Sequence, residues 1–130
     1  MNVETPHVSP VVLIVDDDPI VRESTHAVLM SQGISALPVA GATEGLEEFR
    51  RSAGNIRVVL LDWNLPGTEP AEMMRHLRLA DSSVRIIIVT GDISLPKHEI
   101  VAAGADQVLW KPFGLSDLLN EVRGALDNAE

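Results

Sequence analysis

Five short apolar runs divide the chain, and stretches of helical length and pattern separate them. The runs fall at about 11–15, 34–39, 57–61, 84–89 and 106–110. Their apolarity is mostly continuous rather than alternating, which is typical of strands buried on both faces of a parallel sheet covered by helices. Because such crossovers are right-handed, the pattern predicts an α/β fold with a doubly wound five-stranded parallel sheet and five helices.

Single residues mark the ends of several predicted elements. Asp18 followed by Pro19 predicts an N-cap and the first residue of a helix, and Gly33 suits the C-terminal end of that helix about four turns later. Pro38 cannot donate to a ladder of strand hydrogen bonds, so its strand is expected at an edge of the sheet. Gly114 and Ser116 are both suitable caps for the last helix.

Two predicted helices carry apolar stripes at helical spacing, which indicates that they cover the sheet. The stripes consist of Met73, Met74 and Leu77 in the third helix, and of Leu115, Leu118, Leu119, Val122 and Leu126 in the fifth. We expect these side chains in the core and not in a cofactor site.

The length of 130 residues suits one domain. Residues 1–9 are polar, contain a proline and show no periodicity, so they predict a short N-terminal arm before a domain at 10–127. The longest apolar runs, VVLIV and IIIV, are too short to cross a bilayer, and no leader precedes them. A cytoplasmic protein without membrane insertion is therefore expected.

Composition excludes several kinds of chemistry. The chain has no cysteine, and its four histidines lack the spacing of metal ligands, so disulfides, thiolate chemistry and a histidine metal site are not expected. The net charge of −9 repels phosphate backbones, which argues against direct nucleic-acid binding.

Polar residues of three chemical kinds follow the predicted strands. Asp16 and Asp17 follow the first strand, Asp62 the third, Thr90 the fourth and Lys111 the fifth. The carboxyl ends of parallel strands meet at one edge of the sheet, where ligands bind in doubly wound folds. Carboxylates about 4 Å apart repel by roughly 4 kcal/mol at an effective dielectric near 20, so the cluster favours a bound divalent cation. Mg²⁺, or Mn²⁺, suits such oxygen ligands.

These residues permit phosphoryl chemistry. A carboxylate can attack phosphorus and form an acyl phosphate if positive charge stabilises the transferring group. The metal and Lys111 would supply that charge, and the Thr90 hydroxyl a further hydrogen bond. Lys111 precedes Pro112, and a cis peptide bond there would direct the lysine toward the sheet. Asp18 is interpreted as a helix cap without a metal role.

The segments LIVDDDP, VVLLDWNLPG, IIIVTGD and WKPF stand in this order at successive strand ends. Over about residues 10–126 the chain thereby resembles the receiver domains of bacterial response regulators. The resemblance implies a flavodoxin-like strand order 2-1-3-4-5. It also implies Asp62 as phosphoacceptor, Asp17 as direct metal ligand, Asp16 as a ligand largely through water, and Asn64 as a ligand through its backbone carbonyl.

The resemblance further implies that Thr90 is a switch hydroxyl and that Lys111 pairs with the acceptor carboxylate and then with phosphate. Gly91 would leave the site accessible, while Asn64 and Asp92 would tune the phosphoryl lifetime. Many members carry an aromatic residue three positions before the lysine, where this chain has Val108. Trp110 lies on the same face by strand alternation, where a role in output and a packing role both remain open.

The expected function is that of a signalling phosphoacceptor rather than an enzyme, which assists its own phosphotransfer and dephosphorylation. Its donor would be a sensor histidine kinase or a histidine phosphotransfer protein. Output would pass by surface contact to a downstream protein target, and a phosphorylation-dependent homodimer is compatible with this. The alternatives are a pseudo-receiver that binds partners without phosphorylation, and a magnesium-dependent phosphohydrolase, for which the short chain offers no cap to exclude water.

Overall fold

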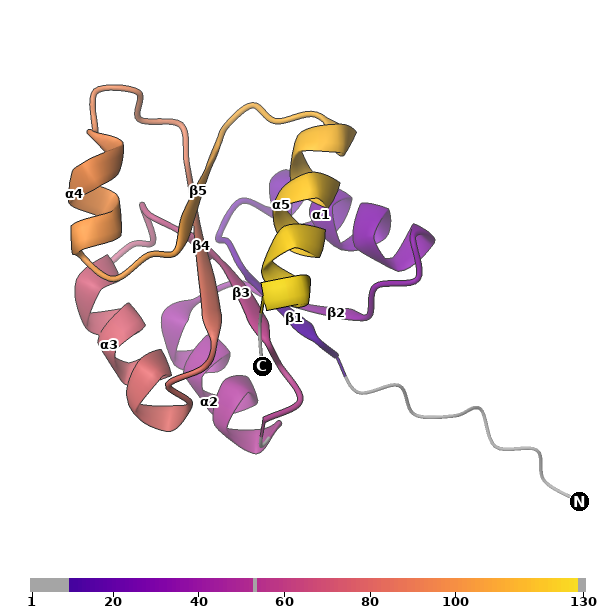
Figure 1. The fold of residues 1–130 in the computed structure, drawn as a ribbon, viewed down its shortest axis with the longest axis horizontal. Helices are drawn as coiled ribbons and strands as arrows, with labels where there is room; N and C mark the ends of the chain where they lie inside the picture. The colour runs from indigo at the N-terminus through magenta and orange to yellow at the C-terminus, as the bar shows by residue number, and fades with distance from the viewer. Residues whose placement is uncertain (1–9, 53, 129–130) are drawn as a thin grey trace, which may run out of the picture.

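A computed structural model describes residues 10–52 and 54–128, so the predicted arm at 1–9 lies outside the described residues. Its five parallel strands pair in the order β2-β1-β3-β4-β5, which confirms the predicted fold (Figure 1). The strands are β1 (Val12–Val15), β2 (Ala36–Val39), β3 (Val58–Asp62), β4 (Arg85–Thr90) and β5 (Gln107–Trp110). The helices are α1 (Pro19–Ser31), α2 (Ala42–Arg51), α3 (Pro70–Ala80), α4 (Lys97–Ala102) and α5 (Leu115–Asn128).

The helices cover both faces of the sheet and enclose two hydrophobic cores. Helices α2, α3 and α4 lie on one face, and α1 and α5 lie on the other (Figure 1). Strands β1 and β3 are buried over their whole length, because both of their faces meet helices. None of the helices in residues 10–52 and 54–128 combines the length and the apolar character needed to span a membrane.

The predicted end signals of α1 and β2 are confirmed. The Asp18 side chain accepts hydrogen bonds from the backbone N–H groups of Ile20 (2.9 Å) and Val21 (3.4 Å). Gly33 follows the helix with a φ of 76°, a conformation that glycine adopts without strain. Pro38 lies in β2, which is an edge strand.

The apolar stripe of α5 needs one correction. Leu118, Leu119 and Val122 are buried as predicted, but Leu115 is 55% exposed. Leu115 is the first residue of α5 and borders an open hollow between α1 and α5 instead of lying beneath the helix. Gly114 takes the cap position, since its carbonyl accepts from Leu118 N.

An ionic network fixes the end of the sheet that lies opposite the carboxyl ends of the strands. Arg78, near the end of α3, donates to the Asp106 carboxylate (2.9 Å) and to the carbonyls of Val84 (3.0 Å) and Gly104 (2.6 Å). Asp106 also accepts from Ile86 N at 2.8 Å. The segment between α4 and β5 is therefore tied to both α3 and β4.

Helix α2 packs unusually close to the strand that ends at the acidic residues. A Cβ atom built at Gly45 would lie 3.1 Å from Val15 Cγ2 and 3.4 Å from Met73 Cε. Val15 directly precedes Asp16, so this contact supports the position of the β1 end. Gly124 in α5 is a matched comparison, because a Cβ atom there would meet nothing within 4 Å.

We predict different effects of the same substitution at these two helical glycines. Gly124→Ala should raise the free energy of unfolding by roughly 0.5–1 kcal/mol, because alanine loses less backbone entropy in a helix. Gly45→Ala should raise the free energy of unfolding clearly less, or lower it, because the new methyl group presses on Val15. Urea unfolding of both variants tests this, and an equal gain at both positions would contradict the close packing of α2 on β1.

Candidate functional site

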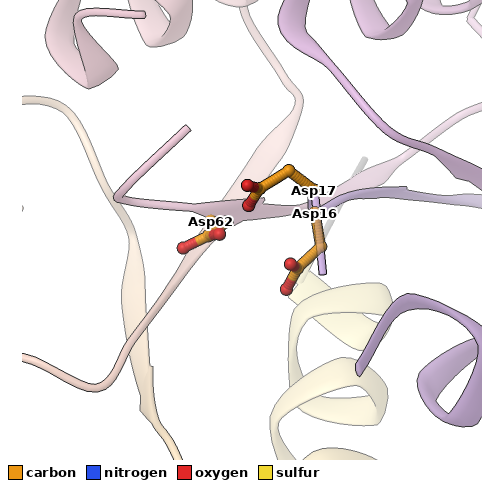
Figure 2. Close-up of side chains that lie close together, drawn as sticks. All are labelled: Asp16, Asp17 and Asp62. Carbon is orange, nitrogen blue, oxygen red and sulfur yellow. The ribbon is translucent and has the colours of Figure 1, made fainter. Parts of the chain in front are cut away.

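The ends of β1 and β3 bring three carboxylates together. Asp16 and Asp17 follow β1, and Asp62 is the last residue of β3. Because Val15 pairs with Leu61 in the parallel register, Asp16 lies level with Asp62. One oxygen from each of the three carboxylates lies within 4.8 Å of the others (Figure 2). Asp16 and Asp62 are buried, with 4% and 6% exposure, whereas Asp17 is exposed.

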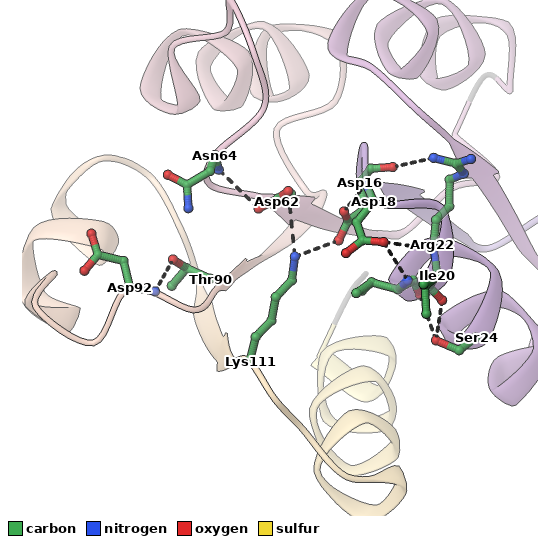
Figure 3. A network of polar contacts seen from close by, with 11 residues as sticks. Asp16, Asp18, Ile20, Arg22, Ser24, Asp62, Asn64, Thr90, Asp92 and Lys111 are labelled. Carbon is green, nitrogen blue, oxygen red and sulfur yellow. Dashed lines mark hydrogen bonds and ion pairs between the residues drawn. The ribbon is translucent and has the colours of Figure 1, made fainter.

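Lys111 brings an ammonium group into this acidic cluster from the end of β5. Its Nζ lies 3.1 Å from Asp16 Oδ2 and 3.8 Å from Asp62 Oδ2 (Figure 3). Its backbone N–H donates to the Thr90 carbonyl at 2.8 Å, which extends the pairing of β5 with β4. The Lys111–Pro112 peptide bond is cis, a point that the sequence left open.

Two hydrogen bonds hold the backbone after β1, and the role of Arg22 in one of them was not predicted from the sequence. The Asp16 carboxylate accepts from Asp18 N at 2.9 Å, and Arg22 Nη1 donates to the Asp16 carbonyl at 3.0 Å (Figure 3). Arg22 stands one helical turn after the Asp18 cap, and that spacing is the only sequence signal that could have identified it. Arg22 thereby fixes the backbone that carries two of the carboxylates.

Asn64 and Thr90 border the cluster on the sides of β3 and β4. The backbone N–H of Asn64 donates to Asp62 Oδ1 at 3.1 Å, and the Asn64 side chain is exposed. Thr90 is fully buried at the end of β4, and its hydroxyl accepts from Asp92 N at 3.1 Å (Figure 3). The hydroxyl hydrogen of Thr90 therefore stays available for an acceptor placed near Asp62.

Gly91 lies beside the stem of the lysine at the end of the sheet. A Cβ atom at Gly91 would lie 3.6 Å from Lys111 Cβ, which is an ordinary van der Waals contact. The predicted site residues Asp16, Asp17, Asp62 and Lys111 thus converge, with Thr90 and Asn64 beside them. Within the residues the structure describes, Val108 is buried in the core beneath α4, and Trp110 is half-buried against that same core.

Burial raises the pKa of the Asp62 carboxyl from its ordinary 3.8 to about 6. The hydrogen bond from the Asn64 backbone N–H opposes this rise in pKa, the charge of Asp16 adds to it, and the ammonium group of Lys111 opposes it. At neutral pH the carboxylate form still predominates, by about tenfold at pH 7.

The charge of the cluster suits a hard divalent cation. Three carboxylates and one ammonium group sum to −2 when all are ionised, which a single divalent cation would neutralise. The three carboxylate oxygens lie within 4.8 Å of one another, so small movements of the side chains would bring them onto one hard cation that prefers oxygen ligands.

The family model described as the response regulator receiver domain matches residues 12–123. The sensory transduction protein RegX3 of Mycolicibacterium smegmatis is 35% identical over 116 residues, which are 88% of this chain and 50% of that protein. The DNA-binding response regulator MtrA of the same organism is 32% identical over 120 residues, 92% of this chain and 51% of that protein. The chain thus spans about half the length of these curated relatives.

A solved structure shows the same architecture. The response regulator receiver domain protein (CheY-like) of Methanospirillum hungatei JF-1 superposes with a TM-score of 0.80 at 32% identity, covering 89% of this chain and 92% of that chain. The matched segment contains both acidic strand ends, Thr90 and Lys111. On the family match and these likenesses, this chain belongs to the response regulator receiver domain family.

Proposed function

We propose that this chain is a phosphoacceptor receiver module in which Asp62 accepts a phosphoryl group in a magnesium-dependent reaction. The observation that carries the proposal is the convergence of three carboxylates from two strand ends with Lys111 Nζ 3.1 Å and 3.8 Å from two of them. The buried position of Asp62, at the edge where ligands bind in this fold, supports its role as the acceptor.

The residues that would hold the cation are Asp16, Asp17, Asp62 and the backbone carbonyl of Asn64. In this assignment Asp17 binds directly, and Asp16 acts largely through water. The bound Mg²⁺, or Mn²⁺, would supply positive charge to the phosphoryl oxygens. The exposed side of the cluster at Asp17 leaves room for the waters that Mg²⁺ retains.

The proposed donor is a phosphohistidine on a sensor histidine kinase or a histidine phosphotransfer protein. A carboxylate oxygen of Asp62 attacks phosphorus, so that a P–O bond forms while the P–N bond breaks. The imidazole leaves with the bonding electron pair and takes a proton from water. The module thereby assists its own phosphorylation.

Lys111 and Thr90 would stabilise the product. The ammonium group of Lys111 lies 3.8 Å from Asp62 Oδ2, close enough to pair with a phosphoryl oxygen after a small shift. The Thr90 hydroxyl accepts from Asp92 N and would donate its hydrogen to another phosphoryl oxygen, because that oxygen can only accept. Asn64 and Asp92 border this space, and their side chains would set how readily water reaches the acyl phosphate.

The signal would leave the module through protein contacts. The net charge of −9 supports a module without direct nucleic-acid binding, although MtrA, twice as long, is named as a DNA-binding regulator. The proposed output is a shift of α4 and β5 that changes contact with a downstream protein or with a second copy of the chain.

We predict that incubation with Mg²⁺ and acetyl phosphate adds the mass of a single phosphoryl group to the protein. Asp62→Asn should abolish the addition, because the amide is a poor nucleophile, and removal of the metal with EDTA should prevent it. Asp81→Asn is the matched control, since Asp81 follows α3 at the other end of the sheet. Intact-protein mass spectrometry measures the outcome.

Two other results would each support a different function. Continuous release of phosphate from a free phosphoester, without a stable adduct, would favour the phosphohydrolase. A protein that folds and binds Mg²⁺ but never gains mass would favour the pseudo-receiver.

We also predict a pH-dependent effect of Asp62→Asn on stability in the absence of metal. Because the folded pKa is raised to about 6, the folded state binds the proton more tightly, and the wild-type protein loses stability as pH rises from about 4 to 6. The change in the free energy of unfolding that Asp62→Asn causes should therefore be more favourable at pH 7.5 than at pH 4, by about 2–3 kcal/mol.

Urea unfolding in EDTA at several pH values between 4 and 7.5 measures this difference. Asp127→Asn, at an exposed position in α5, is the control for the loss of one carboxylate. A difference between wild type and Asp62→Asn that stays constant across the pH range would contradict the burial of an ionisable Asp62 carboxyl.

A further inference from the structure

The short segment between β1 and α1 carries two of the three carboxylates of the site. Asp16 and Asp17 are consecutive residues, so a single planar peptide unit joins them. The direction of the carbonyl in this unit fixes how the backbone passes from one residue to the next. A change in that direction would therefore turn the Asp17 side chain relative to the Asp16 side chain.

One side chain holds this peptide unit from the first turn of α1. Arg22 Nη1 donates to the Asp16 carbonyl at 3.0 Å (Figure 3). The backbone N–H of Arg22 donates to the Asp18 carbonyl at 2.9 Å, and Asp18 N donates to the Asp16 carboxylate at 2.9 Å. Three hydrogen bonds thereby enclose the segment from Asp16 to Asp18, and the Arg22 side chain makes the one that acts on the peptide unit between the carboxylates.

The surroundings of Arg22 make the Asp16 carbonyl its firmest partner. The Arg22 side chain is 18% exposed and pairs with Glu23, whose carboxylate is 3.8 Å away and 65% exposed. An ion pair with so exposed a partner contributes little to stability. A hydrogen bond from a charged donor is stronger than one from a neutral donor. The contact with the Asp16 carbonyl is therefore the one that a loss of Arg22 would affect most.

Arg22 and Lys111 act on the acidic cluster in different ways. Lys111 Nζ contacts the carboxylates of Asp16 and Asp62, at 3.1 Å and 3.8 Å, and so neutralises part of their charge. Arg22 instead contacts the Asp16 backbone carbonyl. Acting through space, its positive charge would repel a bound cation, whereas its hydrogen bond holds the ligands of that cation in place. The two effects of Arg22 on cation binding therefore have opposite signs.

We propose that Arg22 is a positioning residue for cation binding, because it holds the Asp16–Asp17 peptide unit in the direction that brings both carboxylates toward Asp62. The inference rests on the proposed function, since it concerns the cation which that function requires. Groups that orient the ligands of a metal without touching the metal typically contribute about 10- to 100-fold to its affinity. The hydrogen bond of Arg22 thus outweighs the repulsion that its charge exerts.

The test measures the binding of Mn²⁺, with the free ion quantified by electron paramagnetic resonance. Arg22→Met should raise the Kd for Mn²⁺ about tenfold, although the substitution removes a positive charge near the site. Arg22→Lys keeps a charged donor on a flexible stem, so its Kd should lie between those of the wild-type protein and Arg22→Met. Displacement of Mn²⁺ by Mg²⁺ should rank the three proteins in the same order.

Two controls separate positioning from stability and from net charge. Arg78→Met removes a guanidinium group that donates to the carbonyls of Val84 and Gly104 at the opposite end of the sheet. It should lower the free energy of unfolding in EDTA and leave the Kd for Mn²⁺ unchanged. Arg51→Met removes an exposed cation that pairs with Glu48 in α2, and it should not raise the Kd.

The outcomes distinguish a failure of this inference from a failure of the proposed function. A Kd of Arg22→Met equal to or below that of the wild-type protein would overturn the inference alone, because the cation would still bind. An equal rise in Arg78→Met would also overturn it, since lost stability would then explain the effect. If Arg22→Met does not fold, Arg22→Gln replaces it with the same expected rise in Kd. A wild-type protein that binds neither Mn²⁺ nor Mg²⁺ would overturn both.

Discussion

The contact of the Lys111 ammonium group with two buried carboxylates is the interaction on which the site depends. Lys111 Nζ lies 3.1 Å from Asp16 and 3.8 Å from Asp62, and both carboxylates are almost inaccessible to water. Two buried carboxylates without a cation would repel each other strongly. The strand order explains why the long, flexible stem of a lysine suits this position, because the stem must pass the end of β4, where it lies beside Gly91.

The ammonium group of Lys111 compensates only part of the negative charge of the carboxylates. The negative charge that remains determines what the site is able to bind. One ammonium group against three carboxylates leaves an excess of negative charge, and the pKa of Asp62 rises to about 6 because burial outweighs the help of Asn64 N–H and Lys111. A divalent cation would remove that excess. Under the proposed function, phosphorylation adds negative charge at Asp62, so the same cation, Lys111 and Thr90 would stabilise the product more than the free acid.

Much of the fold and the convergence of the site could be predicted because each rests on local signals. Continuous apolar runs indicated the buried strands, Asp18 and Gly33 marked the ends of α1, and the ends of parallel strands necessarily meet. Leu115 was misplaced because helical periodicity does not tell where a helix begins relative to its neighbour. The contacts of Arg22 and Arg78 escaped prediction because their acceptors are mainly backbone carbonyls, which carry no sequence signal.

The two ends of α4 are held very differently, and this determines how the helix is able to move. At its far end, Arg78 donates to the Gly104 carbonyl and to Asp106, which ties the segment between α4 and β5 to α3. At its near end, residues 91–94 are exposed, and only Leu95 contacts the core before the helix begins. The segment before α4, next to Thr90, is therefore held weakly, whereas the segment after α4 is held firmly.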